Sequence, residues 1–455
     1  MSETLIVSVS GVRGLVGKDL TPELVARYAA ALGFLLRGSG DEIVLARDAR
    51  TSGPMFALAA TAGLQSVGMN VVDCGLIPTP TAQLAVEHHR AAGAIVITAS
   101  HNPVEWNALK FVGPDGMFLP LDMAGQLFDL AQSGDFARAG WDTVGGMTTD
   151  GDAVRRHIEG VLGLSVLDVA KIRQRDFVVA LDCVRGAGGT IMPELLERLG
   201  CRVVTMDVEP DGRFPRSPEP IPAHLAKLGE LVHSSRAVIG MAVDPDVDRL
   251  ALVDESGAPI GEDYTLAFAV RSVLQQRAGP VVTNLSTSLV VDDAAREFGV
   301  QVVRAPVGEA NVAAAMKSGG AVIGGEGNGG VMFPALHIGR DAPVAAALVL
   351  DLMARTGLSV SELVAAQPRY IIVKAKGPRD RDLEPVYGDL EGAFPDAIVD
   401  RQDGLRLAWP DSWLHVRPSG TEPIVRFIAE ARTGAAAQQL IDAARVRLAP
   451  PRPPG

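Results

Sequence analysis

The sequence has 455 residues, 47% of them hydrophobic and 21% charged, which allows a sizeable core and excludes a disordered or low-complexity chain. Its 54 Asp and Glu residues outnumber 42 Lys and Arg residues, and this formal charge of −12 argues against a nucleic-acid partner. The three cysteines match neither a zinc motif nor a secreted disulfide framework, and there is no signal peptide or apolar run of membrane-spanning length, so we expect a cytoplasmic protein without a membrane partner.

One pattern of short β-branched strands alternating with helices occurs three times, and this pattern is typical of βαβ units with a mostly parallel sheet. Strands are expected first at residues 43–45, 70–73 and 94–97, then at 177–181, 202–206 and 237–243, and finally at 280–283, 301–303 and 321–323. The helices between them are expected at 54–67, 81–89, 191–199, 222–233, 289–298 and 309–317. Because open α/β sheets bind ligands beyond the carboxyl ends of their strands, the loops after the third strands are predicted to face one cleft.

The pattern changes after residue 367, where strands within 370–377, 397–404, 404–409 and 413–420 precede a helix at 434–448. We therefore predict an α/β fold of three related α/β domains with mixed, mostly parallel sheets, and a smaller C-terminal α+β domain, arranged around one central cleft. The predicted domain boundaries are 1–150, 151–255, 256–367 and 368–455.

The first of these loops reads T-A-S-H-N-P over residues 98–103, and it makes Ser100 a candidate nucleophile at a strand end. An ordinary polar turn is the alternative. A hydrolase triad built from Ser100 and His101 is unlikely to form, because adjacent side chains of an extended chain point to opposite sides. We expect His101 to shape the loop or to contact a phosphate.

The second loop reads D-P-D-V-D-R and carries Asp244, Asp246 and Asp248 at alternate positions. An extended segment would direct these carboxylates to one side, where they would suit Mg²⁺ or another hard divalent ion. An EF-hand is rejected because Arg249 stands where that loop requires Gly, and a solvated acidic turn remains the alternative. Because Mg²⁺ often keeps phosphate oxygens as ligands, the loop suggests phosphoryl chemistry.

The third loop, G-E-G-N-G-G over 325–330, formally matches a dinucleotide fingerprint, but no helix opens after it. We interpret it as a loop that brings Glu326 and Asn328 to a polyhydroxyl ligand.

The C-terminal domain carries R-P-S-G-T-E-P over 417–423, which combines a guanidinium, hydroxyls and backbone N–H groups. This combination predicts a phosphate clamp with Arg426 nearby, and a plain turn is the alternative. Arg13 lies between two glycines and suits an anion contact.

In this order, the loops resemble those of the α-D-phosphohexomutase superfamily, which includes phosphoglucomutases, phosphomannomutases and phosphoglucosamine mutases, and the resemblance covers essentially the whole chain. It implies a phosphorylated Ser100 that holds Mg²⁺ together with the three loop aspartates. The sugar hydroxyls are then bound by Glu326 and Asn328. The phosphate that does not react is held by Arg417, Ser419, Gly420 and Thr421, with Arg426 nearby.

The resemblance also implies a reaction that interconverts hexose 6-phosphate and hexose 1-phosphate through a hexose 1,6-bisphosphate, which also acts as an activator. Positive charge around the reacting group is expected from Arg13, His101, Lys110 and Arg249, and Lys110 or Arg13 is expected to assist proton movement. The loop has Asn328 and Gly330 where many relatives have Ser and His, and its form, with G-R-D-A-P downstream, resembles archaeal-type phosphoglucosamine mutases.

We favour glucosamine phosphate as substrate, with mannose and glucose phosphates as alternatives. A metal-dependent sugar phosphatase and a non-catalytic sugar-phosphate sensor are the hypotheses from other classes. The chain is expected to act as a monomer or a homodimer.

Overall fold

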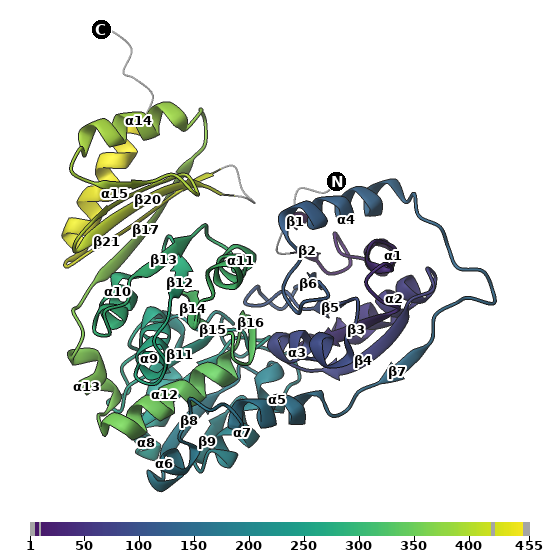
Figure 1. Cartoon of the computed structure of the whole chain (residues 1–455), viewed down its shortest axis with the longest axis horizontal. Coiled ribbons are helices and arrows are strands. Elements are labelled where there is room, and N and C mark those ends of the chain that lie inside the picture. The colour runs from purple at the N-terminus through teal and green to yellow at the C-terminus, as the bar shows by residue number, and fades with distance from the viewer. Residues whose placement is uncertain (1–4, 9–10, 420–423, 449–455) are drawn as a thin grey trace.

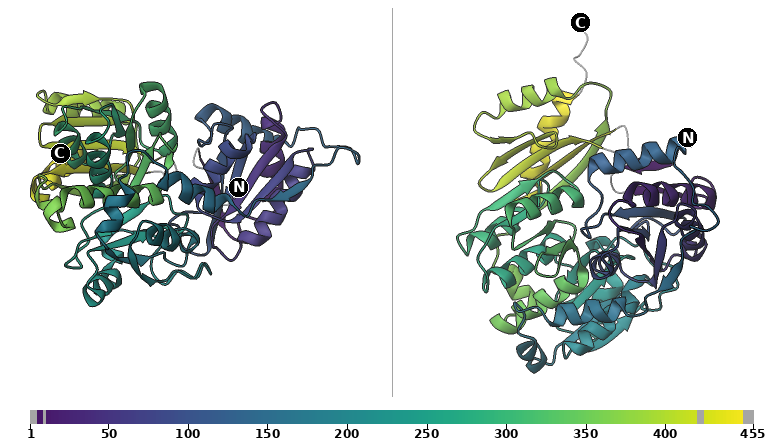
Figure 2. Two further views of the ribbon diagram at one scale, coloured as in Figure 1. Left: turned by 60° about the horizontal axis from the view of Figure 1, so that its bottom comes forward. Right: turned by 45° about the vertical axis from the view of Figure 1, so that its right-hand side comes forward.

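The computed structural model describes residues 5–8, 11–419 and 424–448, which form four sheets in succession along the chain. In Figure 1 the N-terminal unit, in purple and blue, lies beside the teal and green units, and the C-terminal unit adjoins the green one. The further views in Figure 2 show the same neighbours. The four-domain α/β architecture predicted from the sequence is confirmed.

The N-terminal unit has a sheet in the order β1-β2-β6-β5-β3-β4-β7. Its strands are β1 (Ile6–Ser8), β2 (Gly11–Leu15), β3 (Glu42–Arg47), β4 (Asn70–Leu76), β5 (Gly93–Ile97), β6 (Trp106–Val112) and β7 (Met147–Thr149), and its helices are α1 (Pro22–Leu36), α2 (Gly53–Gln65), α3 (Thr79–His89) and α4 (Leu121–Ser133). Helix α1 begins where it does because Thr21 accepts a hydrogen bond from the Leu24 N–H and Pro22 occupies the first turn.

The second and third units have sheets in the orders β11-β10-β8-β9 and β13-β12-β14-β15-β16. The second unit comprises α5 (Ala153–Leu162), α6 (Val169–Gln174), β8 (Val178–Asp182), η1 (Ala187–Thr190), α7 (Met192–Arg198), β9 (Arg202–Met206), η2 (Pro222–His224), α8 (Ala226–Ser235), β10 (Ile239–Val243) and β11 (Leu250–Val253). The third comprises α9 (Asp263–Leu274), β12 (Val281–Asn284), α10 (Leu289–Arg296), β13 (Val302–Ala305), α11 (Glu309–Gly319), β14 (Ile323–Glu326), β15 (Gly330–Phe333), β16 (His337–Arg340), α12 (Ala342–Thr356) and α13 (Val360–Ala365).

The C-terminal unit has one antiparallel sheet in the order β17-β21-β20-β19-β18 with helices beside it. Its elements are β17 (Ile371–Pro378), α14 (Glu384–Ala393), β18 (Ile398–Asp400), β19 (Leu405–Trp409), β20 (Ser412–Pro418), β21 (Ile424–Ala431) and α15 (Gly434–Leu448). No helix in the described part of the chain is long and apolar enough to cross a membrane.

The first three sheets repeat one arrangement that decides where the polar loops lie. In each, three strands pair in parallel with the first strand in the middle, as β4-β3-β5, β9-β8-β10 and β13-β12-β14. An antiparallel strand then pairs with the third, namely β6, β11 and β15. Each predicted loop is the turn between the third strand and this antiparallel strand, so the three loops occupy equivalent places in the three sheets.

The second and third units share one hydrophobic core. It joins Leu181 and Met241 of the second sheet to Phe268 on α9 and Leu348 on α12, and α12 is buried along most of its length. The N-terminal and C-terminal units have cores of their own. The middle units therefore form one continuous body, and the predicted boundaries at 150, 255 and 367 remain predictions.

Buried polar contacts attach the outer units to this body. His157 on α5 bonds to Thr81 of the first unit through Nδ1 at 2.8 Å and to Asp341 Oδ2 of the third through Nε2 at 2.9 Å. Asp341 also meets His337 Nε2 at 2.9 Å and accepts from the Val344 N–H, which makes it the N-cap of α12.

Buried Glu430 on β21 attaches the C-terminal unit. Its carboxylate accepts from the Leu289 N–H at 2.8 Å, at the N-terminus of α10, where a negative charge is favoured. Trp413 Nε1 donates to the same carboxylate at 2.6 Å.

One predicted helix has a different form. Residues 222–233 were expected to form a single helix, but the structure has a 3₁₀ turn at Pro222–His224 and then α8 from Ala226 to Ser235. Leu225, with φ −104° and ψ 10°, lies outside the helical region and separates the two segments. The prediction of one continuous helix was wrong at this point.

Candidate active site

Ser100 lies at the tip of the turn between β5 and β6, in a strained backbone conformation. Its φ of 48° is in the left-handed region, which a residue with a Cβ rarely adopts without compensating contacts. The Ser100 N–H donates to Thr98 Oγ1 at 2.9 Å, and its hydroxyl donates to Asp244 Oδ2 at 2.9 Å. The turn therefore directs the serine hydroxyl into the aspartate cluster of the second unit.

Arg50, which the sequence analysis missed, provides these compensating contacts. Its Nη2 donates to the carbonyls of Ser100 and Asn102, each at 2.7 Å. Its Nη1 donates to the carbonyls of Pro103 at 2.7 Å and Trp106 at 2.9 Å. Because Asp48 and Arg50 directly follow β3, the strand beside β5, their position at the same sheet edge was the available signal.

The aspartates of the second unit converge through a turn and not through an extended segment. Asp244, Asp246 and Asp248 are buried and offer carboxylate oxygens that all lie within 4.8 Å of one another. Residues 245–247 form a turn, with Val247 at φ 65°, a strained value for a β-branched residue. The prediction that the carboxylates meet is confirmed, but the extended geometry given as its reason was wrong.

Most carboxylate oxygens of this cluster have hydrogen-bond partners from the protein. Asp244 Oδ1 accepts from the backbone N–H groups of Asp248 and Arg249. Asp246 Oδ2 accepts from Lys110 Nζ at 2.7 Å and from Thr79 Oγ1 at 2.7 Å. Within the described residues, Asp246 Oδ1 and Asp248 Oδ1 are buried and accept no hydrogen bond.

These two oxygens, Asp244 Oδ2 and the Ser100 hydroxyl form a set of hard ligands that fits a divalent cation such as Mg²⁺.

The pKa values of the charged groups in the cluster are shifted in different directions. Burial, together with the neighbouring Asp248, raises the pKa of Asp244 well above its ordinary value. Burial alone would also raise the pKa of Asp246, but Lys110 lowers it below its ordinary value. Burial likewise opposes the charge of Lys110, yet Asp246 and Asp248 raise its pKa. The lysine is therefore held as a cation that balances part of the cluster.

The other predicted cationic residues surround Ser100. His101 Nδ1 lies 3.4 Å from Ser100 Oγ, so the two side chains do approach one another, contrary to the extended-chain expectation. Burial and then the nearby Arg249 lower the pKa of His101 to about 2. Burial and Arg249 also lower the pKa of Arg13, whose Nη1 donates to Asn102 at 3.3 Å. Repulsion among these groups indicates a place that favours an anion.

The third loop is a β-hairpin turn between β14 and β15, which excludes the dinucleotide-binding interpretation, as expected. Gly329 has φ 86°, and a Cβ there would lie 2.4 Å from the Leu250 carbonyl. The Leu250 N–H donates to the Gly329 carbonyl at 3.0 Å, which places this loop directly beside the end of the aspartate loop. A residue with a side chain would force the two loops apart.

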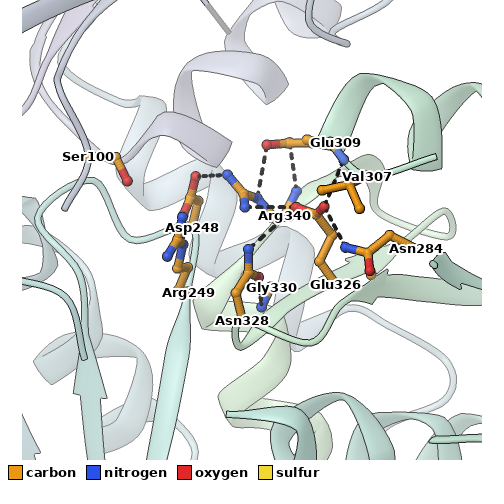
Figure 3. Close-up of polar contacts among 12 residues, drawn as sticks. Ser100, Asp248, Arg249, Asn284, Val307, Glu309, Glu326, Asn328, Gly330 and Arg340 are labelled. Atoms are coloured by element: carbon orange, nitrogen blue, oxygen red, sulfur yellow. Dashed lines mark hydrogen bonds and ion pairs between the residues drawn. The ribbon is translucent and has the colours of Figure 1, made fainter. Parts of the chain in front are cut away.

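Glu326 and Asn328 are held in the hairpin by hydrogen bonds (Figure 3). Glu326 Oε1 accepts from Asn284 Nδ2 at 2.8 Å and from the Gly308 N–H at 3.2 Å. Asn328 Nδ2 donates to Glu326 Oε2 at 3.4 Å, and Asn328 Oδ1 accepts from the Gly330 N–H at 3.1 Å. The structure thus brings the predicted sugar loop next to Ser100 and the aspartates.

Arg340, also missed from the sequence, lies between these two loops (Figure 3). Its Nη2 donates to Asp248 Oδ2 at 2.6 Å and its Nη1 to Glu326 Oε2 at 3.0 Å. The only sequence signal was its place in the G-R-D-A-P segment, which we read as a family feature and not as a site.

The predicted phosphate clamp lies in the C-terminal unit. Arg417 on β20 and Arg426 on β21 are directly opposite in the sheet, so two of the predicted clamp residues are neighbours. The Arg417 Nε pairs with Asp403 Oδ2 at 2.9 Å, and Asp403 Oδ2 also accepts from the Val307 N–H at 3.2 Å. Buried Ser419 donates its N–H to the Ile424 carbonyl at 2.9 Å. Gly420 and Thr421 lie outside the described residues.

Arg417 is therefore linked to the sugar loop through Asp403 and residues 307–308. The sugar loop is linked in turn to the aspartates, Lys110 and Ser100 through Arg340.

Comparisons with known proteins identify the family to which this chain belongs. Four domains of the phosphoglucomutase/phosphomannomutase family match in order. These are α/β/α domain I at residues 5–138, α/β/α domain II at 155–257, α/β/α domain III at 261–370 and the C-terminal domain at 373–446. The chain belongs to the phosphoglucomutase/phosphomannomutase family, and the resemblance predicted from its motifs is confirmed.

Relatives and a solved structure match over nearly the full chain. A phosphoglucomutase/phosphomannomutase of Thermococcus kodakarensis is 38% identical over 95% of this chain and 96% of its own. A probable phosphoglucosamine mutase of Methanopyrus kandleri is 37% identical over 95% of each chain. The crystal structure of a phosphoglucomutase/phosphomannomutase family protein of Burkholderia thailandensis superposes with a TM-score of 0.85 at 27% identity, covering 98% of this chain and 97% of that one.

Proposed function

We propose that this phosphohexomutase interconverts hexose 6-phosphate and hexose 1-phosphate by way of a phosphorylated Ser100 and a hexose 1,6-bisphosphate. The observation that carries the proposal is the hydrogen bond of 2.9 Å from the Ser100 hydroxyl to Asp244, beside carboxylate oxygens of Asp246 and Asp248 that accept no hydrogen bond within the described residues. A serine poised on a hard-cation site is suited to carry a phosphoryl group.

Ser100, Asp244, Asp246 and Asp248 would hold the cation. A bound Mg²⁺ would neutralise charge on the phosphoryl oxygens as the group is transferred. The chain's own residues keep the remaining carboxylate oxygens occupied. Lys110 binds one oxygen of Asp246, and Arg340 binds one of Asp248, so each aspartate keeps a second oxygen that accepts no hydrogen bond within the described residues; that of Asp248 lies 3.6 Å from Arg249 Nε.

The transfer itself needs little covalent chemistry from the protein. The bond from phosphorus to Ser100 Oγ breaks as phosphorus bonds to the sugar hydroxyl oxygen; the sugar hydroxyl loses its proton to a base, and Ser100 Oγ takes up a proton. Arg13 and Arg249 act electrostatically on His101 beside Ser100, and Arg249 Nε lies 3.6 Å from Asp248 Oδ1, so these two guanidinium groups are suited to contact phosphoryl oxygens. Lys110, whose charge is fixed by two aspartates, serves better as a charge balance than as the base.

His101 is placed to exchange a proton with Ser100 Oγ as the phosphoryl group leaves or returns. A phosphoryl group on Ser100 adds negative charge near His101 Nδ1, which lies 3.4 Å from the serine oxygen, and such a charge raises a histidine pKa. The second anion site, at Arg417 and Ser419, would hold the phosphate that does not react. The bisphosphate must then turn over so that its other phosphate reaches Ser100.

For the sugar, we propose glucosamine phosphate, with mannose and glucose phosphates as alternatives. The preference rests on the G-E-G-N-G-G form of the sugar loop, with the Asn328 carboxamide beside Glu326, and on relatives named probable phosphoglucosamine mutase at 34–37% identity. The relative at 38% identity, named phosphoglucomutase/phosphomannomutase, keeps the alternatives open. Comparing kcat/KM for the three sugar phosphates decides among them.

The decisive variant is Ser100→Ala. We expect mutase turnover to be abolished while binding of glucosamine 6-phosphate stays measurable by calorimetry, because the alanine removes only the phosphoryl carrier. Ser234→Ala, which changes a serine on the surface of α8, is the matched control and should keep wild-type activity.

Turnover of Ser100→Ala near the wild-type rate would disprove the phosphoserine. A sugar phosphatase using the same aspartates would release inorganic phosphate, whereas a mutase conserves it and responds to added glucose 1,6-bisphosphate. A sensor would bind the sugar phosphate without either reaction.

A further inference from the structure

Arg340 is the point at which the aspartate loop and the sugar loop meet. It ends β16 and is 8% exposed. Its guanidinium contacts three carboxylates from separate elements: Nη2 donates to Asp248 at 2.6 Å, Nη1 to Glu326 at 3.0 Å and Nε to Glu309 at 2.9 Å. In Figure 3 it lies between Asp248 on one side and Glu326 and Glu309 on the other.

Each guanidinium nitrogen therefore has a carboxylate partner, so Arg340 is committed to the protein and not to the substrate. The guanidinium is planar and rigid, so the directions of its N–H groups are fixed relative to one another. Glu309 also holds Arg340 in place through the main chain, since its other carboxylate oxygen accepts from the Arg340 backbone N–H at 3.2 Å. The position of one loop carboxylate thus constrains the position of the other.

These contacts also decide which oxygen each loop carboxylate presents. In Asp248, Oδ2 is occupied by Arg340 and, at 3.4 Å, by Lys110, while Oδ1 accepts no hydrogen bond among the described residues and lies 3.6 Å from Arg249 Nε. In Glu326, Oε2 binds Arg340 while Oε1 is held by Asn284 and the Gly308 N–H. Without Arg340, both carboxylates could rotate, and two buried acidic groups would lose their shared counter-charge.

We infer that Arg340 is a positioning residue that couples cation binding at the aspartate loop to sugar-phosphate binding at the hairpin loop. The inference deepens the proposed function and rests on it for the identity of the two ligands. One rigid fork orients Asp248 and Glu326 together, so both affinities depend on the same side chain. A lysine at this position would keep the charge but could not hold two carboxylates in a fixed relative orientation.

The test compares Arg340→Lys with Arg355→Lys in the full chain. Arg355 is a partly buried arginine on α12 whose guanidinium binds Asp351 at 2.7 Å and the Val166 carbonyl at 3.1 Å, far along the helix from Asp341. Cation binding is measured without turnover from the electron paramagnetic resonance signal of free Mn²⁺. Binding of glucosamine 6-phosphate is measured by calorimetry in a Ser100→Ala background.

We expect Arg340→Lys to weaken both affinities by about tenfold or more, the usual size of effect for a residue that orients a metal ligand. Arg355→Lys should change neither. In the active enzyme, Arg340→Lys should raise both the KM for sugar phosphate and the Mg²⁺ concentration that gives half-maximal activity. An Arg340→Lys variant that weakens only one affinity, or that merely lowers the melting temperature as Arg355→Lys does, would overturn the inference.

Glu309→Gln is the second variant if Arg340→Lys does not fold. It keeps the shape of the side chain but weakens its hold on Arg340, so both affinities should fall together by less than the roughly tenfold effect expected of changing the orienting residue itself. Unchanged affinities in Glu309→Gln would contradict the coupling. If the wild type proves to have no mutase turnover while Arg340→Lys still weakens both bindings, the proposed function fails and the role of Arg340 stands.

Discussion

Arg50 offers the most demanding test of how the reactive loop is held, through the substitution Arg50→Met. The change removes hydrogen bonds to the carbonyls of Ser100, Asn102, Pro103 and Trp106, all between 2.7 and 2.9 Å. It also breaks the buried ion pair from Arg50 Nε to Asp48 Oδ2 at 3.1 Å.

Removing one partner of a buried ion pair costs about 3–5 kcal/mol. Burial raises the pKa of Asp48 even with Arg50 beside it, so in the variant this carboxyl would be protonated and part of the cost relieved. The carbonyls that lose their donor cost about 1–3 kcal/mol each where water cannot reach them, but these costs are not additive. We expect the free energy of unfolding to fall by about 4 kcal/mol.

The assay is urea denaturation followed by tryptophan fluorescence, because Trp106 begins β6 directly after the loop. A released loop should also misplace the Ser100 hydroxyl, and a displacement of about 1 Å can lower kcat about 100-fold. KM should change little, because the hydrogen bonds of Arg50 go to Asp48 and to carbonyls of residues 100–106. The stability and kcat of Arg50→Lys should lie between those of the wild type and Arg50→Met, because an ammonium has fewer hydrogen-bond donors and all of them are on one nitrogen.

Arg355→Met is the control for losing a partly buried arginine elsewhere, and it should leave kcat unchanged. Wild-type stability and kcat in Arg50→Met would show that the loop holds its strained conformation without the guanidinium, and the reasoning would be refuted.

Two further predictions concern the clamp and the contacts that join the first unit to the third. Arg417→Ala should raise the KM for hexose 6-phosphates by about 10- to 100-fold with a smaller change in kcat, because a charge-assisted bond to phosphate contributes about 1.5–3 kcal/mol; steady-state kinetics would contradict the clamp if KM did not change. Burial alone would raise the pKa of Asp341, but His157 and His337 hold this pKa below its ordinary value. The ionised Asp341 therefore stabilises the fold fully above about pH 4, and this stabilisation is lost as the pH falls through the folded-state pKa. Asp341→Asn should therefore cost about 3 kcal/mol in urea unfolding at pH 7 and progressively less below about pH 4, and an equal cost at pH 7 and pH 3 would argue against the assignment.

The sequence by itself determined where the reactive groups lie along the chain. Strands, helices and turns follow local patterns of apolar and β-branched residues, so the T-A-S-H-N-P, D-P-D-V-D-R and G-E-G-N-G-G segments could be assigned to the ends of the third strands without coordinates. Because three units repeat one plan and open α/β sheets bind ligands beyond the carboxyl ends of their strands, the sequence predicted that the loops of Ser100 and the aspartates face one cleft, although they follow strands of two different sheets.

Only the tertiary structure decided which residues hold these loops in place. Arg50 is 50 residues from Ser100 in the sequence, and Arg340 is 92 residues from Asp248. Buried ion pairs over such distances leave no periodic signal in the chain, because they depend on how sheets and their connections pack. The strained turns at Ser100 and Val247 were hidden for the same reason, since isolated residues of these types disfavour that backbone and only surrounding contacts stabilise it.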